Sequence, residues 1–442
     1  MKSLFLIPTL CFCLCLCAQS RAQNAAPGLQ QNATSITRSE AEHQALKNNP
    51  RITASRLLAL ASGQVTREVQ SAELPQISGS MTAVKAEDAS RIGAGTLNSS
   101  RLYTHAGVGG TLTQLITDFG HTHNLVTNAK LLAKAQEQTA LATEQDVLLA
   151  TDQVFYRLLN AQSLLEVAKA AVAARGNVQD LTQALTKSAL KSELDLNVAS
   201  ADYSQAQLLQ LDAENAVASA SADLAAILNA PANSDFKAVE PSNQTPQPPP
   251  ENAASVISEA QQQRPDLRAL NLDTQAAHKL VTAQKEQRLP TISATAIGGI
   301  TPVRPDGIFG ENWYAAAGVN LSLPLFTGFR ISAQTEEARL REKASQQQAQ
   351  DLSNTIERDV KIAVLATQTA YQRIDVTEKF RTQAAQALGL AKTRYKLGLS
   401  SIVELSQAQL QSTQANVAAV NARYDYLLAL RTLDYARGNL TP

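Results

Sequence analysis

Two acidic residues have the types and positions most suited to act on ions. Asp195 and Glu404 lie 209 residues apart, each just past a predicted turn between two long helices. Acids at helix N-termini are favoured by the helix dipole, so both could be ordinary solvated residues. If several chains met at these turns, the same acids would instead form a ring of carboxylates that attracts cations. The two residues alone leave both interpretations open.

Two histidines, His121 and His123, are spaced as metal ligands could be, but no third ligand lies nearby. We expect both to be ordinary surface residues and predict no metal site. Soft metals such as copper favour sulfur ligands, and no cysteine follows Cys17. The sequence shows no convincing pair of carboxylates for hydrolysis and no convincing Ser-His-Asp arrangement. The glycines at 107–110 do not suit a phosphate-binding loop, because they fall inside a predicted strand rather than before a helix. The chain is therefore predicted to be no enzyme and to use no cofactor.

The N-terminus has the pattern of a secretory signal over residues 1–22. Lys2 precedes an apolar run, and Ser20-Arg21-Ala22 offers a small-x-small cleavage site. All four cysteines lie inside this segment, so the mature chain would contain none and could form no disulfide. The alternative is a lipoprotein signal with Cys17 as the lipid acceptor, although Leu16 stands where a small residue is preferred. Residues 23–35 are then an N-terminal extension.

Composition narrows the class of protein. The formal net charge is zero, which removes the basic footprint of a nucleic-acid binder. Aromatic residues make up only 4% of the chain, so long helices packed through alanine are expected rather than an aromatic core. No stretch of about 20 apolar residues follows the signal, and a membrane crossing would have to use strands.

The chain contains an internal duplication. Leu74-Pro75-Gln76-Ile77-Ser78 returns as Leu289-Pro290-Thr291-Ile292-Ser293, at an offset of 215 residues. We place repeat one at 36–230 and repeat two at 253–440, joined by a proline-rich, semi-rigid linker at 231–252. Each repeat reads as a helix that ends before Pro75 or Pro290, a pair of strands, and a long helical hairpin.

The strands alternate apolar with small polar residues, which predicts one oily face and one wet face. They are expected at 76–84, 104–116, 291–299 and 313–326. Aromatic residues at both ends of such strands fit the two interfacial girdles of a membrane barrel, although a soluble hairpin would give a similar pattern. These aromatic residues are Tyr103, Trp313 and Tyr314 at one end and Phe119, Phe326 and Phe329 at the other.

The helices carry alanine at a sustained seven-residue spacing, which predicts supercoiled helices with closely packed backbones. A helix of about 66 residues would span ~100 Å, far more than a bilayer. The long helices are expected at about 120–187, 193–229, 330–396 and 402–437.

Closure of the sheet sets the number of chains. Four strands cannot close a membrane barrel, and open edges in lipid leave backbone groups unsatisfied. Two chains would supply eight strands and a filled interior, whereas three would supply twelve and an aqueous lumen. We therefore predict a homotrimer with a 12-stranded membrane barrel that continues into a coiled-coil α-helical barrel, mainly α overall.

The order and spacing of these elements, which occur in both repeats, resemble those of the TolC-like family of outer-membrane efflux proteins. The resemblance covers nearly the whole mature chain and no single motif is decisive. It is carried by the Leu-Pro-x-Ile-Ser strand entries, the strand-to-helix junctions at 114–120 and 324–330, and the hairpin tip at 394–405.

The resemblance implies a passive exit duct in the cell outer membrane of a Gram-negative-type bacterium, with a helical barrel through the periplasm. Its partners would be a periplasmic adaptor (membrane fusion protein) and an inner-membrane pump, in a tripartite efflux or type I secretion system. The substrate is not visible in the sequence. A secreted or periplasmic coiled-coil structural or adhesion protein is the alternative; it would stay soluble without detergent.

In the family, the hairpin tips form the periplasmic entrance, where they meet the adaptor and constrict the pore. The resemblance places the constriction at Asp195, Glu404 and Gln407. Ala189 stands where the second tip has Gly398, so a different turn geometry is expected. Gln407 and Ser400 stand where relatives often carry an acid and a base, which predicts a weaker closing network. The expected tip and adaptor contacts are Ala189, Leu190, Ser192, Tyr395, Gly398, Leu399 and Ser400.

Overall fold

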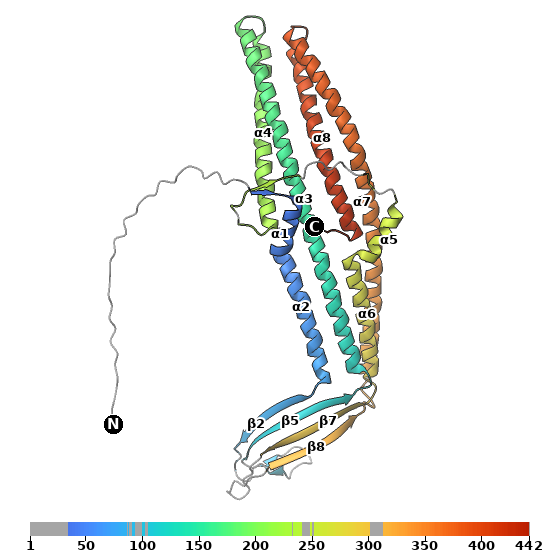
Figure 1. The fold of residues 1–442 in the computed structure, drawn as a ribbon. Helices are drawn as coiled ribbons and strands as arrows, with labels where there is room; N and C mark the ends of the chain where they lie inside the picture. Colours follow the sequence, from blue (N-terminus) through green and yellow to red (C-terminus); the bar gives the residue numbers. More distant parts are fainter. Residues whose placement is uncertain are drawn as a thin grey trace, which may run out of the picture.

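The computed structural model describes residues 34–85, 87, 91–92, 100–101, 105–231, 233–240, 248–249, 252–300 and 313–441. The predicted signal at 1–22 and Tyr103 lie outside these residues. The chain is long and narrow, with a sheet at one end and two helical hairpins extending from the middle to the other end (Figure 1).

The two repeats share one order of main elements: two short helices, two long strands and a tall helical hairpin (Figure 1). Repeat one contains α1 (Arg38–Asn48), α2 (Pro50–Gln70), the 3-10 turn η1 (Ser71–Glu73), β2 (Gln76–Val84), β3 (Arg91–Ile92), β4 (Ser100–Arg101), β5 (His105–Thr117), α3 (His121–Lys187) and α4 (Glu193–Ile227). The short strands β1 (Thr34–Ile36) and β6 (Phe236–Ala238) flank it and pair in parallel, and β6 lies in the segment predicted as linker. Repeat two contains α5 (Ala253–Gln263), α6 (Pro265–Glu286), β7 (Thr291–Ile300), β8 (Trp313–Ser322), α7 (Arg330–Lys396) and α8 (Ile402–Arg437).

The two opening helices and the last strand differ from the sequence expectation. The opening helix of each repeat is broken in two, because Asn49 and Arg264 are extended (ψ 124° and 123°) before a proline at the first helical position. The last strand ends at Ser322 rather than at 326. Pro324 has no backbone N–H and cannot extend a ladder.

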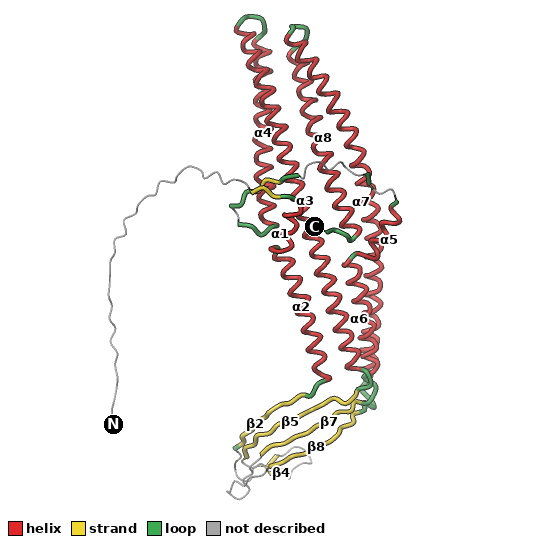
Figure 2. The backbone as a smooth tube through the Cα atoms, viewed as in Figure 1, coloured by secondary structure: helices red, strands yellow, loops and turns green. Residues whose placement is uncertain are grey.

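The four long strands form one antiparallel sheet in the order β2-β5-β7-β8, with β2 and β8 at its edges (Figure 2). Side chains alternate between the faces of a strand, and directly paired residues share a face. One row across the sheet is Met81, Val108, Ile300 and Trp313. This apolar face also carries Ile77, Leu112, Ile292, Val319 and Leu321, whereas the opposite face carries Ser78, Ser80, Thr82, Thr111, Thr113, Ser293, Thr295, Asn320 and Ser322.

The long helices pack through small side chains at a seven-residue spacing. In α3 the buried seam includes Ala133, Ala140, Ala161 and Ala168, and the same heptad position continues as Arg175. Small residues let helix backbones approach closely, which suits the heptad packing of a coiled coil. Among the described residues, no helix is both long enough and apolar enough to span a membrane.

Candidate functional site

The tip turns of the two hairpins have the same backbone geometry. Ala189 and Gly398 both adopt a left-handed conformation, with φ of +56° and +73°. In each turn the next residue's N–H bonds a carbonyl five positions back, Leu190 to Leu185 and Leu399 to Arg394. The expected difference between the turns is therefore wrong: Ala189 accepts the left-handed conformation at a strain of about 1–2 kcal/mol.

Each tip is followed by a serine that caps the returning helix. The Ser192 hydroxyl accepts from the Asp195 N–H at 3.1 Å, and the Asp195 carboxylate accepts from the Ser192 N–H at 3.2 Å. Ser401 accepts from the Glu404 N–H at 3.3 Å. Within one chain, both acids thus lie in the first turn of a helix, where the dipole favours them.

Glu404 has a charged partner that the sequence pattern did not indicate. Arg394, in the last turn of α7, lies 3.1 Å from the Glu404 carboxylate and also donates to the Leu399 carbonyl at 3.3 Å. Arg394 therefore supplies a base near Glu404 within one chain, although Ser400 does not, and the weaker closing network between chains stays a prediction. Both side chains are about half exposed, so the pair is screened and modest in strength.

Tyr395 joins the two hairpins instead of facing outward. Its side chain is only 1% exposed, and its hydroxyl lies 3.1 Å from the Thr182 hydroxyl of α3. The Lys191 ammonium lies 4.6 Å from the centre of its ring. Contrary to the expectation, Tyr395 is therefore buried and not available to contact an adaptor. Thr182 is a site residue that the sequence pattern did not reveal.

The remaining tip residues fall into exposed and enclosed groups. Leu190 and Leu399 are 70% and 65% exposed, which leaves an apolar surface at the end of both hairpins. Gln407 is exposed one turn after Glu404, on the same side of α8. The Ser400 hydroxyl is enclosed and lacks a hydrogen-bond partner among the described residues. The structure thus brings Glu404 and Gln407 together at the tip.

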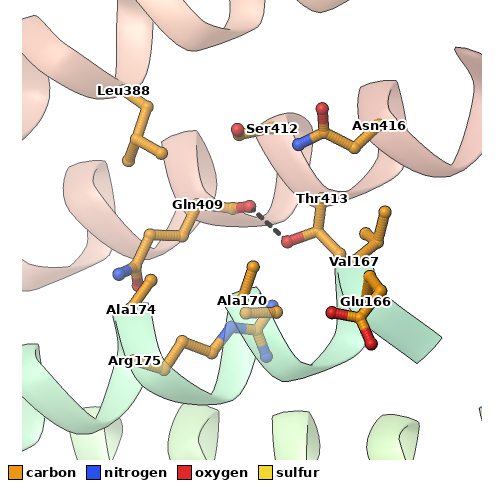
Figure 3. A pocket seen from close by; sticks show the side chains of 11 residues that line it. Glu166, Val167, Ala170, Ala174, Arg175, Leu388, Gln409, Ser412, Thr413 and Asn416 are labelled. Atoms are coloured by element: carbon orange, nitrogen blue, oxygen red, sulfur yellow. Dashed lines mark hydrogen bonds between the residues drawn. The ribbon is translucent and has the colours of Figure 1, made fainter. Parts of the chain in front are cut away.

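A groove separates α3 from α8 below the tip (Figure 3). It has a volume of about 420 Å³ and is lined by residues of α3, α7 and α8. Arg175 donates to the carbonyl of Asp202 at 3.0 Å, so it belongs to the contact of α3 with α4. The Gln409 amide nitrogen is enclosed without a partner among the described residues. The hairpins are therefore loosely packed between the tip contact at Tyr395 and the hydrogen bond of Ser163 with Tyr424.

The aromatic residues of the sheet do not all lie on one face. Trp313 is 78% exposed and lies on the apolar face. Tyr314 lies on the polar face, in a row with Ser80, Gly109 and Gly299, so the register removes it from a lipid-facing girdle. A Cβ at either glycine would collide with the Tyr314 hydroxyl, so the two glycines make room for the ring.

Three aromatic residues lie at the helix end of the sheet. Phe119 follows β5 and is 51% exposed, whereas Phe326 and Phe329 follow β8 and are 78% and 76% exposed. The last two rings contact each other edge to face, with centroids 5.8 Å apart. Exposed aromatic rings at this level suit a boundary between lipid and water.

The two histidines near the start of α3 have different environments. His121 is half-buried, and its Nδ1 lies 2.7 Å from the Ala283 carbonyl of α6, so it is not the surface residue expected. His123 is exposed. The residues described contain no group of three or more His, Cys, Asp or Glu side chains placed to hold a metal.

The duplicated helix–strand–strand–hairpin unit, the two-faced sheet and the paired tips define a class of protein: channels of the bacterial outer membrane. The family model described as "Outer membrane efflux protein" matches residues 42–230 and 256–439. The chain therefore belongs to the outer membrane efflux protein family, and it is an outer-membrane efflux channel.

Curated relatives and solved structures agree with this assignment. The outer membrane protein TolC of Vibrio cholerae is 25% identical over 332 residues, covering 72% of this chain and 73% of the relative. The outer membrane efflux protein BepC of Brucella suis is 25% identical over 428 residues, covering 93% and 87%. The crystal structure of VceC from Vibrio cholerae matches with a TM-score of 0.79 at 20% identity, covering 91% of this chain and 96% of that one. The relatives do not favour the alternative of a secreted scaffold.

Proposed function

We propose that three copies of the chain form one continuous exit duct, gated at the hairpin tips and coupled there to a periplasmic adaptor and an inner-membrane pump. Residues 1–22 would direct its export. The observation that carries the proposal is the sheet, which has one apolar face and two open edges, at β2 and β8. In lipid those edges must be paired, and a second copy supplies the partner strand.

The helices support the same closure. α6 packs between α3 and α7, whereas its repeat-one counterpart α2 packs on α3 alone among these long helices. The uncovered side of α2 exposes Leu57, Leu58 and Leu60 by 59–67%. We infer that this side packs on α7 of a neighbouring chain, in the same way as α6 packs on α7 within one chain.

At the tip, three chains would bring together three copies of Glu404 and Gln407, with Asp195 at the matching position of the other hairpin. Within each chain, Arg394 and the Tyr395–Thr182 contact hold the hairpins in place. The exposed Leu190 and Leu399 offer the adaptor an apolar surface. The duct would thus be narrow and lined by carboxylates at its entrance.

Replacing Glu404 tests this gate. In planar bilayers, Glu404→Ala should raise single-channel conductance and weaken block by divalent cations, because it removes one carboxylate per chain and frees Arg394. The matched control is Glu193→Ala, an exposed acid in the first turn of α4. Unchanged conductance and cation block in Glu404→Ala, or equal changes in both variants, would remove Glu404 from the constriction.

A further inference from the structure

Charged side chains from three helices meet where the two hairpins begin. Arg431 of α8 lies 2.7 Å from the carboxylate of Glu42 on α1 and 2.6 Å from that of Asp152 on α3. It also donates to the Thr441 carbonyl at 3.1 Å, which holds the C-terminal end of the chain. This cluster joins α1 and α3 of repeat one to α8 of repeat two.

The two carboxyl groups are buried and face each other. Glu42 and Asp152 are both 0% exposed. Among the described residues, one carboxylate oxygen of each has no hydrogen-bond partner. Both carboxylates contact the same guanidinium, that of Arg431, so they lie close to each other. Two buried carboxylates at such a site repel each other when both are charged, so a proton on one of them stabilises the pair.

The surrounding groups leave an excess of acid. Arg38 of α1 pairs with Glu42, and Asp434 of α8 lies 3.7 Å from Arg431. Tyr156 of α3 is also close, but burial raises the pKa of its hydroxyl to about 12, so it stays neutral. Three acids thus face two arginines, and one retained proton balances the cluster.

The other repeat shows that the fold does not need this cluster. By the repeat offsets of 215 for the first helix and 209 for the long helices, Ile257 replaces Glu42, Lys361 replaces Asp152 and Ala222 replaces Arg431. Ile257 packs against an apolar core between α5, α7 and α8. Buried charges contribute little net stability compared with apolar packing, so a charged group in only one repeat calls for another role.

We propose that Glu42, Asp152 and Arg431 form a proton-binding clasp that fastens α1 and the end of α8 to α3. The clasp is tight when one carboxyl group holds a proton, and it loosens when both carboxyl groups are ionised. The two buried carboxylates then repel each other across the guanidinium that they share.

The pKa of Glu42 gives the direction and the range. Burial, together with the neighbouring carboxyl group of Asp152, raises the pKa of Glu42 from 4.5 to about 7, against the opposing charges of Arg38 and Arg431. In the unfolded chain Glu42 loses its proton near the ordinary value. The stability that the protonated clasp contributes is therefore fully present below pH 4.5 and is lost as pH rises through about 7.

Hydrogen exchange of the full-length, detergent-solubilised protein tests the clasp. Between pH 5 and 8.5, with intrinsic exchange rates corrected, protection of α1 and of residues 437–441 should fall by at least about tenfold, the equivalent of one pKa unit. Glu42→Gln keeps a permanent donor toward Asp152 and should show no such fall. Glu137→Gln, at an exposed position of α3, is the control and should behave as the wild type.

Infrared titration of the wild type supplies an independent readout: the band of a protonated carboxyl should disappear near pH 7 and be absent from Glu42→Gln. A flat exchange profile in the wild type, or the same fall in Glu42→Gln, would overturn the clasp. If Glu42→Gln does not assemble, the apolar triple variant Glu42→Leu, Asp152→Leu and Arg431→Met takes its place. The clasp concerns one chain, so failure of the proposed duct to conduct leaves both readouts intact.

Discussion

Val319→Arg, in the edge strand β8, should prevent stable insertion of the protein into the outer membrane. Val319 is 69% exposed and lies on the apolar face of the sheet. An arginine on the lipid side of a barrel costs about 2–4 kcal/mol at mid-depth, and a trimer would incur that cost three times. Membrane fractionation and the yield of trimer in detergent measure the effect.

The neighbouring residue provides the control. Asn320→Arg changes the same strand by the same side chain, but Asn320 lies on the polar face in register with Ser293. It should leave insertion and trimer yield near the wild-type level, because the new charge faces water. Equal losses in both variants would show that the two faces do not divide lipid from lumen.

Arg431→Ala should be the most destabilising single change in the helical part of the molecule. It leaves Glu42 and Asp152 buried without the guanidinium that contacts both, and breaking a buried charge group in this way costs about 3–5 kcal/mol. Urea unfolding followed by circular dichroism at pH 8, where the unpaired acids repel most strongly, measures the loss.

Arg423→Ala is the comparison for that loss, since Arg423 also lies on α8 and pairs with Glu240 at 2.9 Å. Its side chain is 54% exposed, and exposed pairs contribute about 0–1 kcal/mol. Similar midpoints for the two variants would mean that the buried cluster adds no more than a surface ion pair.

Regular patterns made the fold predictable. The seven-residue spacing of alanines such as Ala133 and Ala140 indicated long paired helices, and those residues are buried in the helix seam. The alternation around Ile77 indicated a strand with one apolar face, as observed. The break before Pro50 could also have been predicted, because a proline holds the preceding residue extended. The apolar pattern continues on both sides of the break and made the two helices look like one.

Contacts between distant segments could not be predicted in the same way. Glu42, Asp152 and Arg431 come from three helices, and no local pattern brings them together. The Tyr395–Thr182 contact depends on how one hairpin packs on the other. The face on which Tyr314 lies could have been predicted. Tyr314 is adjacent to Trp313, and adjacent residues in a strand point to opposite faces.

In the proposed trimer, β8 of one chain pairs with β2 of the next, so that three chains close one barrel. Thr111 pairs with Ile297 between β5 and β7. The repeat equivalents are Asn320, 209 residues after Thr111, and Thr82, 215 residues before Ile297. Asn320 of one chain should therefore face Thr82 of its neighbour on the polar side of the sheet.

Cysteine cross-linking measures this pairing directly. The double variant Asn320→Cys, Thr82→Cys places the two thiols across the proposed seam, and all four natural cysteines lie within residues 11–17. On oxidation, denaturing gels without reductant should show chains linked up to three and no further, and each single variant should stay unlinked. Linked species larger than three chains, or a disulfide formed only within one chain, would contradict a barrel closed by three copies.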